Sequence, residues 1–277
     1  MTDFIGTSGN DVFRGKAHDD TFDLSQGGND KASGAGGDDT FSFGGALTAA
    51  DSIDGGAGSD TVILAGDYSA GLVLGATTLV NVEEIDLTGH FNYLLTMNDA
   101  NVAAGQTMTV NAGDLVASNR FTFDGSHETD GAFSISVLSA KAHLIGGAGS
   151  DTFNIGAKLG SGIGDQGTGG DTLTGGGGAD HFVFLSLGKA GVRPHEITDL
   201  TNDDQIDISN IDADKVKAGD QAFHLVGKFT HHTAQAVLSF DSDTGKTSLL
   251  LDVDGDAKAD YVVSIDGDHH DFTNFVL

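Results

Sequence analysis

The chain has 277 residues and a formal net charge of −28, from 41 acidic and 13 basic side chains. This length allows one large domain or two modest ones. The acidic excess repels nucleic acid and anionic membranes, which argues against both as partners. Only Glu83, Glu84, Glu128 and Glu196 are glutamate, and the other acids are aspartate. Aspartate favours turns and holds a hard oxygen ligand close to the backbone, so the composition indicates cation-binding loops.

The glycine and cysteine contents further narrow the possible class of protein. The chain has 42 Gly, one Pro and no Cys. Abundant Gly with so little Pro indicates repeated tight turns. Without Cys there are no disulfides, thiolate sites or thiol nucleophiles, so calcium is the natural cross-link. No stretch reaches transmembrane length, and the first residues lack the basic and apolar regions of a cleaved signal peptide. We therefore expect any export address to lie elsewhere in the chain.

Nine-residue repeats begin at residue 6. They read GTSGNDVFR (6–14), GKAHDDTFD (15–23), SQGGNDKAS (25–33), GAGGDDTFS (34–42), GGAGSDTVI (55–63), GGAGSDTFN (146–154), QGTGGDTLT (166–174) and GGGGADHFV (175–183). The eighth position is almost always apolar, and the sixth is always aspartate. The sixth-position residues are Asp11, Asp20, Asp30, Asp39, Asp60, Asp151, Asp171 and Asp180, and Asp51 fits the same frame.

The repeat has a mechanical interpretation. Gly at the first, second and fourth positions lets the backbone turn sharply and point its carbonyls inward, and the sixth-position Asp adds a carboxylate. Positions seven to nine form a very short strand whose middle side chain enters the core. Two repeats make one coil of a parallel solenoid, because Asp11 and Asp30, like Asp20 and Asp39, are 19 residues apart. Stacked loops then enclose several Ca²⁺ ions in an all-oxygen environment.

The repeat loops supply the predicted metal ligands. Besides the nine aspartates named above, the predicted ligand set contains Gly6, Gly9, Gly28, Gly34, Gly37, Gly55, Gly56, Gly58, Gly146, Gly147, Gly149, Gly169, Gly175, Gly176 and Gly178. GGAGSDTVI and GGAGSDTFN match the consensus GGxGxDxUx of the repeats-in-toxin (RTX, hemolysin-type) family, which this chain resembles. The resemblance implies a calcium-binding parallel β-roll.

Between residues 64 and 145 the glycine register stops. Short alternating apolar runs follow at 82–89, 93–99, 107–113, 120–126 and 132–139, separated by Asn, Asp, Gly and Ser turns. The pattern predicts strands, either as a calcium-poor continuation of the solenoid or as a sandwich inserted between two rolls. The continuation is the simpler hypothesis, because a strand can stack directly on the coil that ends at Ile63.

The C-terminal part resembles the module that follows the roll in serralysin-type metalloproteases and other type I secretion substrates. The matching elements are FVF (182–184), ITDL (197–200), DQIDISNID (204–212), DVDGDAKADYVVSIDG (252–267) and the tail DFTNFVL (271–277). The resemblance implies that a type I exporter reads this uncleaved C-terminus. We also expect the module to cap the roll and cover its open strand edge.

The segment DVDGDAKAD places Asp252, Asp254, Asp256 and Asp260 close together. Alternating carboxylates predict an additional calcium loop, although the EF-hand pattern is not met, because Ala257 and Val263 replace the required Gly and Glu. The alternative is a polar hairpin turn between the strands LLLD and YVVSI. The sequence leaves both interpretations open.

The chain is therefore predicted to be an all-β parallel β-roll or β-solenoid with a β-rich cap. We divide it into an N-terminal roll (1–63), a calcium-poor segment (64–145), a second roll (146–184) and a C-terminal capping and secretion module (185–277). No HExxH or GxSxG motif occurs, so the chain is not expected to be an enzyme.

Three functions use the same calcium-triggered folding. The first is a structural or cell-surface role, in a surface layer, adhesin or matrix, with polysaccharide binding or self-assembly. The second is the non-catalytic secretion and folding module of a larger exoenzyme such as a protease or lipase. The third is a small host-directed effector, which lacks the amphipathic segment that a pore requires. All three predict a secreted, extracellular protein.

Overall fold

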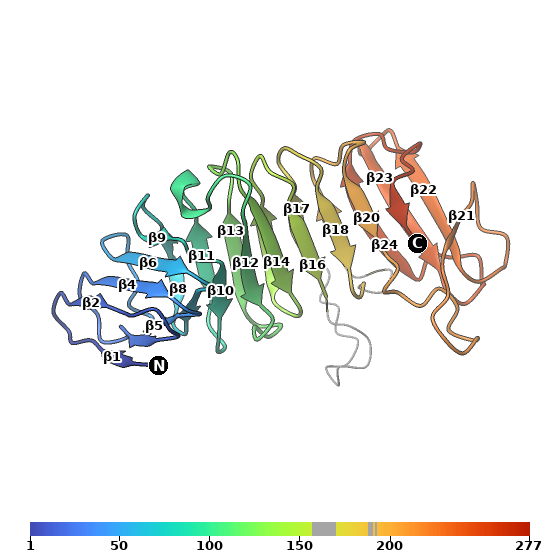
Figure 1. The fold of residues 1–277 in the computed structure, drawn as a ribbon. Coiled ribbons are helices and arrows are strands. Elements are labelled where there is room, and N and C mark those ends of the chain that lie inside the picture. The colour runs from blue at the N-terminus through green and yellow to red at the C-terminus, as the bar shows by residue number, and fades with distance from the viewer. Residues whose placement is uncertain (157–169, 188–190, 192) are drawn as a thin grey trace.

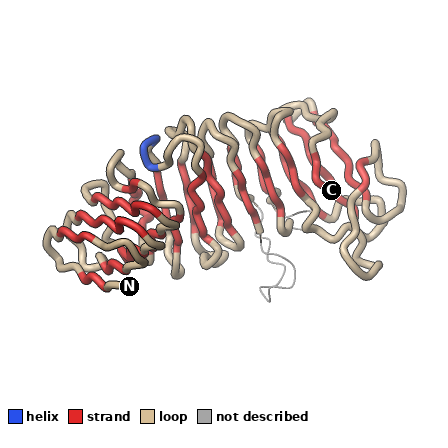
Figure 2. Tube along the Cα trace, viewed as in Figure 1, coloured by secondary structure: helices blue, strands red, loops and turns tan. Residues whose placement is uncertain are grey.

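The computed structural model describes residues 1–156, 170–187, 191 and 193–277. Within these residues the chain is an elongated stack of coils with the N-terminus at one end (Figure 1). Its helical element is the 3₁₀ turn η1 (Asp99–Asn101), the blue segment in Figure 2. No helix of the described part is long and apolar enough to cross a membrane. The expected all-β parallel solenoid is confirmed.

The described strands pair into three sheets. An eleven-stranded sheet runs the length of the molecule and contains, in spatial order, β1 (Asp3–Ile5), β3 (Thr21–Asp23), β5 (Thr40–Gly44), β7 (Thr61–Leu64), β10 (Glu84–Leu87), β12 (Thr107–Ala112), β14 (Ala132–Val137), β16 (Thr152–Ile155), β18 (His181–Phe184), β20 (Gln205–Asp207) and β25 (Phe275–Val276). A four-stranded sheet contains β2 (Val12–Arg14), β4 (Lys31–Gly36), β6 (Ser52–Ala57) and β9 (Leu79–Val80). A ten-stranded sheet contains β8 (Tyr68–Val73), β11 (Tyr93–Thr96), β13 (Arg120–Asp124), β15 (Lys141–Ile145), β17 (Thr172–Thr174), β19 (His195–Ile197), β24 (Tyr261–Asp266), β23 (Lys246–Asp252), β22 (Gln235–Asp241) and β21 (His224–Leu225).

The register places equivalent repeat positions on top of one another. In the eleven-stranded sheet Phe22 pairs with Phe41, and in the four-stranded sheet Ala32 pairs with Ile53; all four residues occupy the eighth position. Every pairing along these two sheets is parallel. Alternate repeats therefore stack, because each coil takes one repeat to reach one sheet and a second repeat to reach the other.

The eighth-position side chains form the core between the sheets. The rings of Phe22 and Phe41 stack with centroids 4.6 Å apart, and Phe153 and Phe182 stack at 5.5 Å. All four are buried. Each coil of the rolls adds only one or two such side chains, because its strands are as short as three residues. The apolar burial available per coil is accordingly small.

The middle segment continues the solenoid. Strand β10 pairs in parallel with β7 on one side and with β12 on the other, and β14 joins β12 to β16. No inserted sandwich occurs, because the alternating apolar residues of these strands face the same core as the repeats. The eleven-stranded sheet thus passes through all four segments defined from the sequence.

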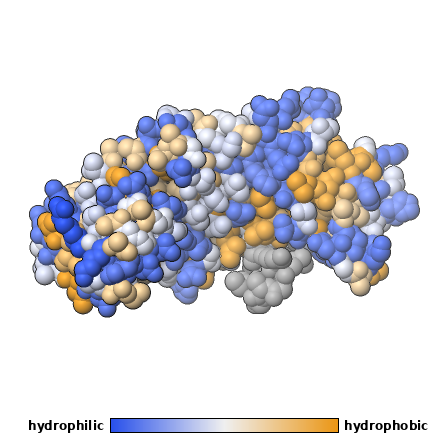
Figure 3. All heavy atoms as spheres, in the orientation of Figure 1, coloured by the Kyte–Doolittle hydropathy of each residue, from blue (hydrophilic) through white to orange (hydrophobic). Residues whose placement is uncertain are grey.

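The C-terminal part covers the last coil. Strands β22, β23 and β24 form an antiparallel meander, and β24 pairs in parallel with β19. The final strand β25 pairs with β20 and so ends the eleven-stranded sheet. In the view of Figure 3 most of the exposed surface is hydrophilic, and apolar atoms gather at the N-terminal end and around the C-terminal strands.

Candidate metal centre

The sixth-position aspartates form ladders along the edge of the solenoid. In the first ladder the backbone N–H of Asp20 donates to Asp39 Oδ1 (2.7 Å), and that of Asp39 donates to Asp60 Oδ1 (2.8 Å). The N–H of Asp60 then donates to Glu83 Oε2 at 2.8 Å. Each loop therefore orients the carboxylate of the next coil, and the parallel register brings one carboxylate into line per coil.

Two further ladders repeat this geometry. In the second, Asp11 N–H donates to Asp30 and Asp30 N–H donates to Asp51, at 2.9 and 2.7 Å. In the third, Asp151 N–H donates to Asp180 and Asp180 N–H donates to Asp204, at 2.8 and 2.9 Å. Adjacent coils lie about 4.8 Å apart, so two neighbouring carboxylates repel by about 3 kcal/mol at an effective dielectric constant near 20. A cation between the coils would cancel this repulsion.

The glycines leave room for oxygen atoms from two coils to converge. A Cβ on Gly34 would overlap both Asp39 Oδ2 and the carbonyl oxygen of Gly55 in the next coil. A Cβ on Gly146 would likewise overlap Asp151 Oδ2 and the carbonyl oxygen of Gly175. The first-position glycine is thus the place where a carboxylate and a carbonyl from adjacent coils meet. This oxygen set fits Ca²⁺, which prefers carboxylate and carbonyl ligands.

The fourth-position glycine faces a carbonyl of the preceding coil. Gly58 has φ +150°, and a Cβ there would overlap the carbonyl oxygen of Gly37. Gly178 has φ +99° and meets the carbonyl of Gly149 in the same way, at 2.5 Å from an ideal Cβ. Carbonyl oxygens of the turn therefore point between coils, as the repeat predicts.

Buried carboxylate oxygens without hydrogen bonds carry the argument for a cation. Asp39 Oδ2 and Asp60 Oδ2 are buried and have no hydrogen-bond partner among the described residues. Burial raises the pKa of Asp60 to about 6, with further contributions from the charges of Asp39 and Glu83. Burial likewise raises the pKa of Asp151 to about 6 and that of Asp180 to about 7. An ionised carboxylate in such a place requires a compensating charge.

The structure places the predicted residues in different surroundings. Asp11 is only partly buried, whereas the other eight sixth-position aspartates are buried. Asp171 Oδ2 lies 3.0 Å from Nδ1 of the buried His195, and Asp171 Oδ1 accepts the N–H of Ala142. Gly169 lies outside the described residues. Gly6, Gly9, Gly28, Gly147 and Gly176 lie in the loops that flank the ladders, and Gly56 lies near the end of β6.

The DVDGDAKAD segment forms the turn between β23 and β24. Asp252, Asp254 and Asp260 each offer one carboxylate oxygen, and the three atoms lie within 4.8 Å of one another. Asp252 is buried, and its two oxygens accept the N–H groups of Gly255 and Ala257. Asp256 stays outside this group, because its carboxylate accepts from Lys258 instead. The segment is therefore a hairpin turn, as one interpretation of the sequence predicts, and this turn brings three of its four carboxylates together.

The sequence interpretation missed Glu83 and Asp204, which end the first and third ladders. Both carry the signal of the repeat's second half, a carboxylate two residues before a buried isoleucine: Glu83 before Ile85, and Asp204 before Ile206. They were missed because no glycines precede them. A fourth ladder, formed by residues at the fifth position of the repeats, was also missed. In it Asp38 N–H donates to Asp19 Oδ1 and Ser59 N–H donates to Asp38 Oδ1.

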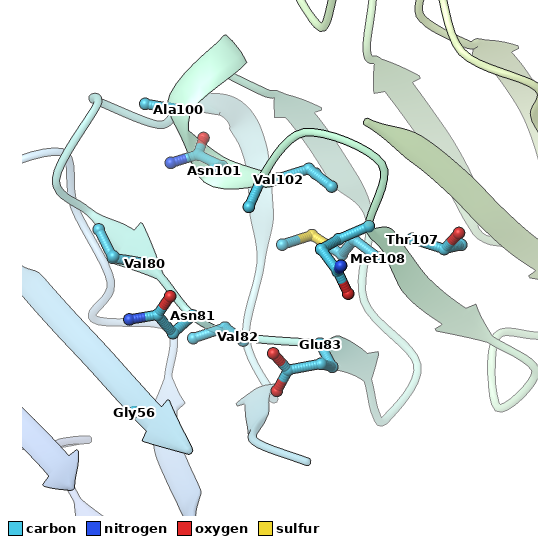
Figure 4. A pocket seen from close by; sticks show the side chains of 12 residues that line it. Gly56, Val80, Asn81, Val82, Glu83, Ala100, Asn101, Val102, Thr107 and Met108 are labelled. Carbon is cyan, nitrogen blue, oxygen red and sulfur yellow. The ribbon is translucent and has the colours of Figure 1, made fainter. Parts of the chain in front are cut away.

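A pocket opens where the first ladder ends. It has a volume of about 260 Å³ and is lined on one side by Gly56 and residues 80–83, and on the other by residues 100–103 and 106–108 (Figure 4). Asn101 is one of the lining residues, and its Nδ2 donates to the carbonyls of Gly75 and Leu79 at 3.0 and 3.1 Å. The regular stacking of nonapeptide loops therefore stops at Glu83.

We expect Gly146→Ala to weaken calcium binding by the second roll. The new Cβ would occupy the space that Asp151 Oδ2 and the Gly175 carbonyl share, so a cation could not be held there. Gly227→Ala is the matched control, because Gly227 has no positive φ and nothing within 4 Å of its Cβ position. Isothermal titration of both variants with CaCl₂ checks this. Equal affinities in the two variants would contradict the assignment of the site.

Comparison with known families agrees with this geometry. Residues 19–277 match the family described as peptidase M10 serralysin C terminal, and residues 3–29 match the RTX calcium-binding nonapeptide repeat. The metalloprotease AprA of Pseudomonas entomophila (strain L48) is 40% identical over 88 residues, which span 31% of this chain and 18% of that protein. The chain thus covers less than a fifth of the length of this relative.

The chain belongs to the serralysin C-terminal family of peptidase M10, and the resemblance noted from its motifs is confirmed. Its RTX repeats bind calcium, and its C-terminal part is a type I secretion module. These features indicate a secreted protein.

Proposed function

We propose that this chain is the calcium-triggered folding and export module of a secreted protein, and that it carries no catalysis of its own. In a cytoplasm with little free calcium the aspartate ladders repel one another and keep the rolls unfolded, which suits passage through a type I exporter. Extracellular calcium modules bind at about 10⁻⁴ to 10⁻³ M, so external calcium closes the coils. Binding and folding are then one linked event.

The observation that supports this proposal is the set of buried carboxylate oxygens without partners. Asp39 Oδ2 and Asp60 Oδ2 face coil-to-coil spaces lined by carbonyls, and neither meets a basic side chain among the described ion pairs. We propose that the glycines and sixth-position aspartates of the rolls ligate several Ca²⁺ ions, and that Asp252, Asp254 and Asp260 hold another. Asp256 belongs to the predicted set, but we do not propose it as a ligand of that ion.

The module could serve as part of a larger exoenzyme or in a cell-surface structure. The similarity to a serralysin C-terminus favours attachment to an exoenzyme. The matched relative is a metalloprotease that is 40% identical to this chain over 88 residues, and residues 19–277 match the serralysin C-terminal family. On this proposal the four sequence segments form one continuous solenoid, because one sheet connects them. The folded solenoid stabilises what it is attached to after secretion.

A structural or cell-surface role is favoured by a different observation. The first coil exposes Ile5 and Val12, each 70% accessible, and the rings of Phe4 and Phe13 are only partly covered. A second copy or a surface polymer would bury this face. Sedimentation of the chain in CaCl₂ separates the two roles: a monomer supports the exoenzyme module, and assembly lost in Ile5→Ser/Val12→Ser supports the structural role.

We expect removal of residues 272–277 to block export by a type I system. These residues carry the tail that the exporter would read, and in the folded chain they supply β25 and the buried Phe272. Removal of residues 1–5 is the matched control, because it deletes β1 from the opposite end of the same sheet. Secretion is measured as the ratio of external to cellular protein. A truncated tail that leaves this ratio unchanged would contradict the role of the tail.

Calcium-dependent circular dichroism of the same two variants distinguishes export from folding. Because the repeats are intact in both, each should still gain β-structure with CaCl₂. A tail variant that is not exported and does not fold would place the defect in folding rather than in recognition.

A further inference from the structure

A cluster of carboxylates lies in the middle segment, where no nonapeptide repeat occurs. Asp99 begins η1, in the loop that leads into β12, while Glu128 and Asp130 lie in the loop that leads into β14. Strands β12 and β14 are neighbours in the eleven-stranded sheet, with Met108 opposite Phe133. The two loops are therefore stacked on adjacent coils, in the same relation as two nonapeptide loops.

The three side chains converge on one point. Asp99, Glu128 and Asp130 each offer one carboxylate oxygen, and these atoms lie within 4.8 Å of one another. Calcium–oxygen distances are about 2.3–2.6 Å, so one ion can contact three oxygens that lie up to about 4.5 Å apart, and the three carboxylates need at most a small adjustment to reach it. The loops are fixed by further contacts: Thr129 donates to Asp99 Oδ1 through its N–H (2.9 Å) and Oγ1 (2.6 Å), and Gly105 N–H donates to the Asp130 carbonyl at 2.7 Å.

Glu128 is the observation that distinguishes this cluster from ordinary surface acids. Its side chain is buried, with 1% of the residue accessible. Oε1 accepts three N–H groups, from Thr129 (3.1 Å), Asp130 (3.1 Å) and Gly131 (2.8 Å). Oε2 is buried and accepts no hydrogen bond within the described part of the chain. The three donors hold the carboxylate in one orientation and leave Oε2 for a different partner.

The charge of the cluster is not balanced by a basic side chain. No ion pair of the described residues includes Asp99, Glu128 or Asp130. A buried carboxylate oxygen without a partner is costly, and two more carboxylates within 4.8 Å increase the cost. A hard divalent cation removes both problems, and carboxylate oxygens are ligands that calcium takes.

We propose that Asp99, Glu128 and Asp130 form a calcium site outside the RTX repeats, which joins the middle segment to the second roll. The link to the roll is direct, because Ala148 N–H donates to the Glu128 carbonyl at 2.9 Å and a Cβ on Gly147 would lie 2.9 Å from Glu128 Cβ. Gly147 also donates to Asp151 Oδ2, which belongs to the third ladder. The ion would thus fix the loop on which the first coil of that roll stacks.

The test is a count of calcium ions on the full chain. Glu128→Gln combined with Asp99→Asn and Asp130→Asn keeps the size of each side chain and removes the charge. Asp114→Asn is the matched control, since Asp114 is an exposed aspartate of the same segment outside the cluster. After equilibrium dialysis against CaCl₂ and elemental analysis, we expect the triple variant to hold one ion fewer than the native chain, and the control to hold the same number. An unchanged count in the triple variant would overturn the site.

A crystal structure of the native chain grown in CaCl₂ covers the case in which the triple variant does not fold. We expect an anomalous peak between Asp99, Glu128 and Asp130. Ions in the repeat loops without a peak here would overturn this site and leave the proposed function standing. Absence of ions from both places would contradict the proposed function as well.

Discussion

Transfer of the native chain from millimolar CaCl₂ to excess EGTA at neutral pH should unfold both rolls. Each coil of a roll contributes a strand of three to six residues and a buried carboxylate, so its apolar burial is small and its electrostatic repulsion is large. A bound ion at a hundredfold excess over its Kd adds about 2.7 kcal/mol. Three or four sites would then supply about 8 to 11 kcal/mol, comparable with the whole net stability of about 5–15 kcal/mol of a typical domain.

Circular dichroism and small-angle scattering check this expectation together. An unfolded chain of this length has a radius of gyration of about 58 Å, whereas a compact one has about 19 Å and an elongated solenoid somewhat more. MgCl₂ at the same concentration is the control, because Mg²⁺ requires a tight octahedral site that these loops do not provide. A chain that keeps its sheet signal and its radius in EGTA would refute calcium-dependent folding.

Hydrogen exchange locates the transition within the molecule. Residues 34–39 and 146–151 should lose protection first in EGTA, because the carboxylates of Asp39 and Asp151 belong to the ladders that require calcium. Strands β12 and β14 should lose it last, since they are six residues long and carry a denser core. Uniform loss along the chain would indicate one cooperative unit instead.

Much of this architecture could be predicted from local spacing. The nine-residue period fixes which side chains enter the core, and an interval of 19 residues between equivalent aspartates fixes the stacking of alternate repeats. Phe22 on Phe41 and Asp20 beside Asp39 follow from that period alone. These features are predictable because every contact joins residues one coil apart.

Features that depend on three-dimensional assembly could not be predicted in this way. Glu83 takes the place of an aspartate at the end of the first ladder, and its longer side chain reaches the Asp60 N–H without a glycine turn before it. Glu128 was one of four glutamates in the sequence, and nothing local marked its burial. The 30 residues that separate Asp99 from its partner Thr129 exceed the period of the repeat, so sequence spacing gave no signal.

The division of strands between the four-stranded and ten-stranded sheets could not be predicted from the sequence either. The coil between β7 and β10 contains both β8 and β9, which join different sheets. Equivalent carboxylates are 19 residues apart in the first coils and 29 apart between Asp151 and Asp180. The coil between β7 and β10 carries turn residues around β8 and β9, and the route of such turns is set by packing on neighbouring coils rather than by their own sequence.

In the absence of calcium, the chain should be more folded at mildly acidic pH than at neutral pH. The folded chain raises the pKa of Asp60 and Asp151 to about 6 and that of Asp180 to about 7, mainly through burial. In the unfolded chain an aspartate titrates near about 3.9. Between these values the folded state binds more protons than the unfolded state, so stability falls as pH rises from about 4 to 7. In EGTA we therefore expect more β-structure at pH 5 than at pH 7.5.

The same carboxylates make calcium and protons competitors. Because a ligand must be deprotonated to bind the ion, the apparent Kd for calcium should rise as pH falls from about 7 to 5, by up to about tenfold per pH unit for each proton displaced. Dichroism in EGTA and calcium titrations at pH 5, 6, 7 and 8 measure both trends. Asp60→Asn/Asp151→Asn/Asp180→Asn is the control, because it removes the three groups with the highest pKa and should flatten the EGTA profile. A native chain equally disordered at pH 5 and pH 7.5, with a calcium affinity independent of pH, would show that these buried carboxylates do not govern folding.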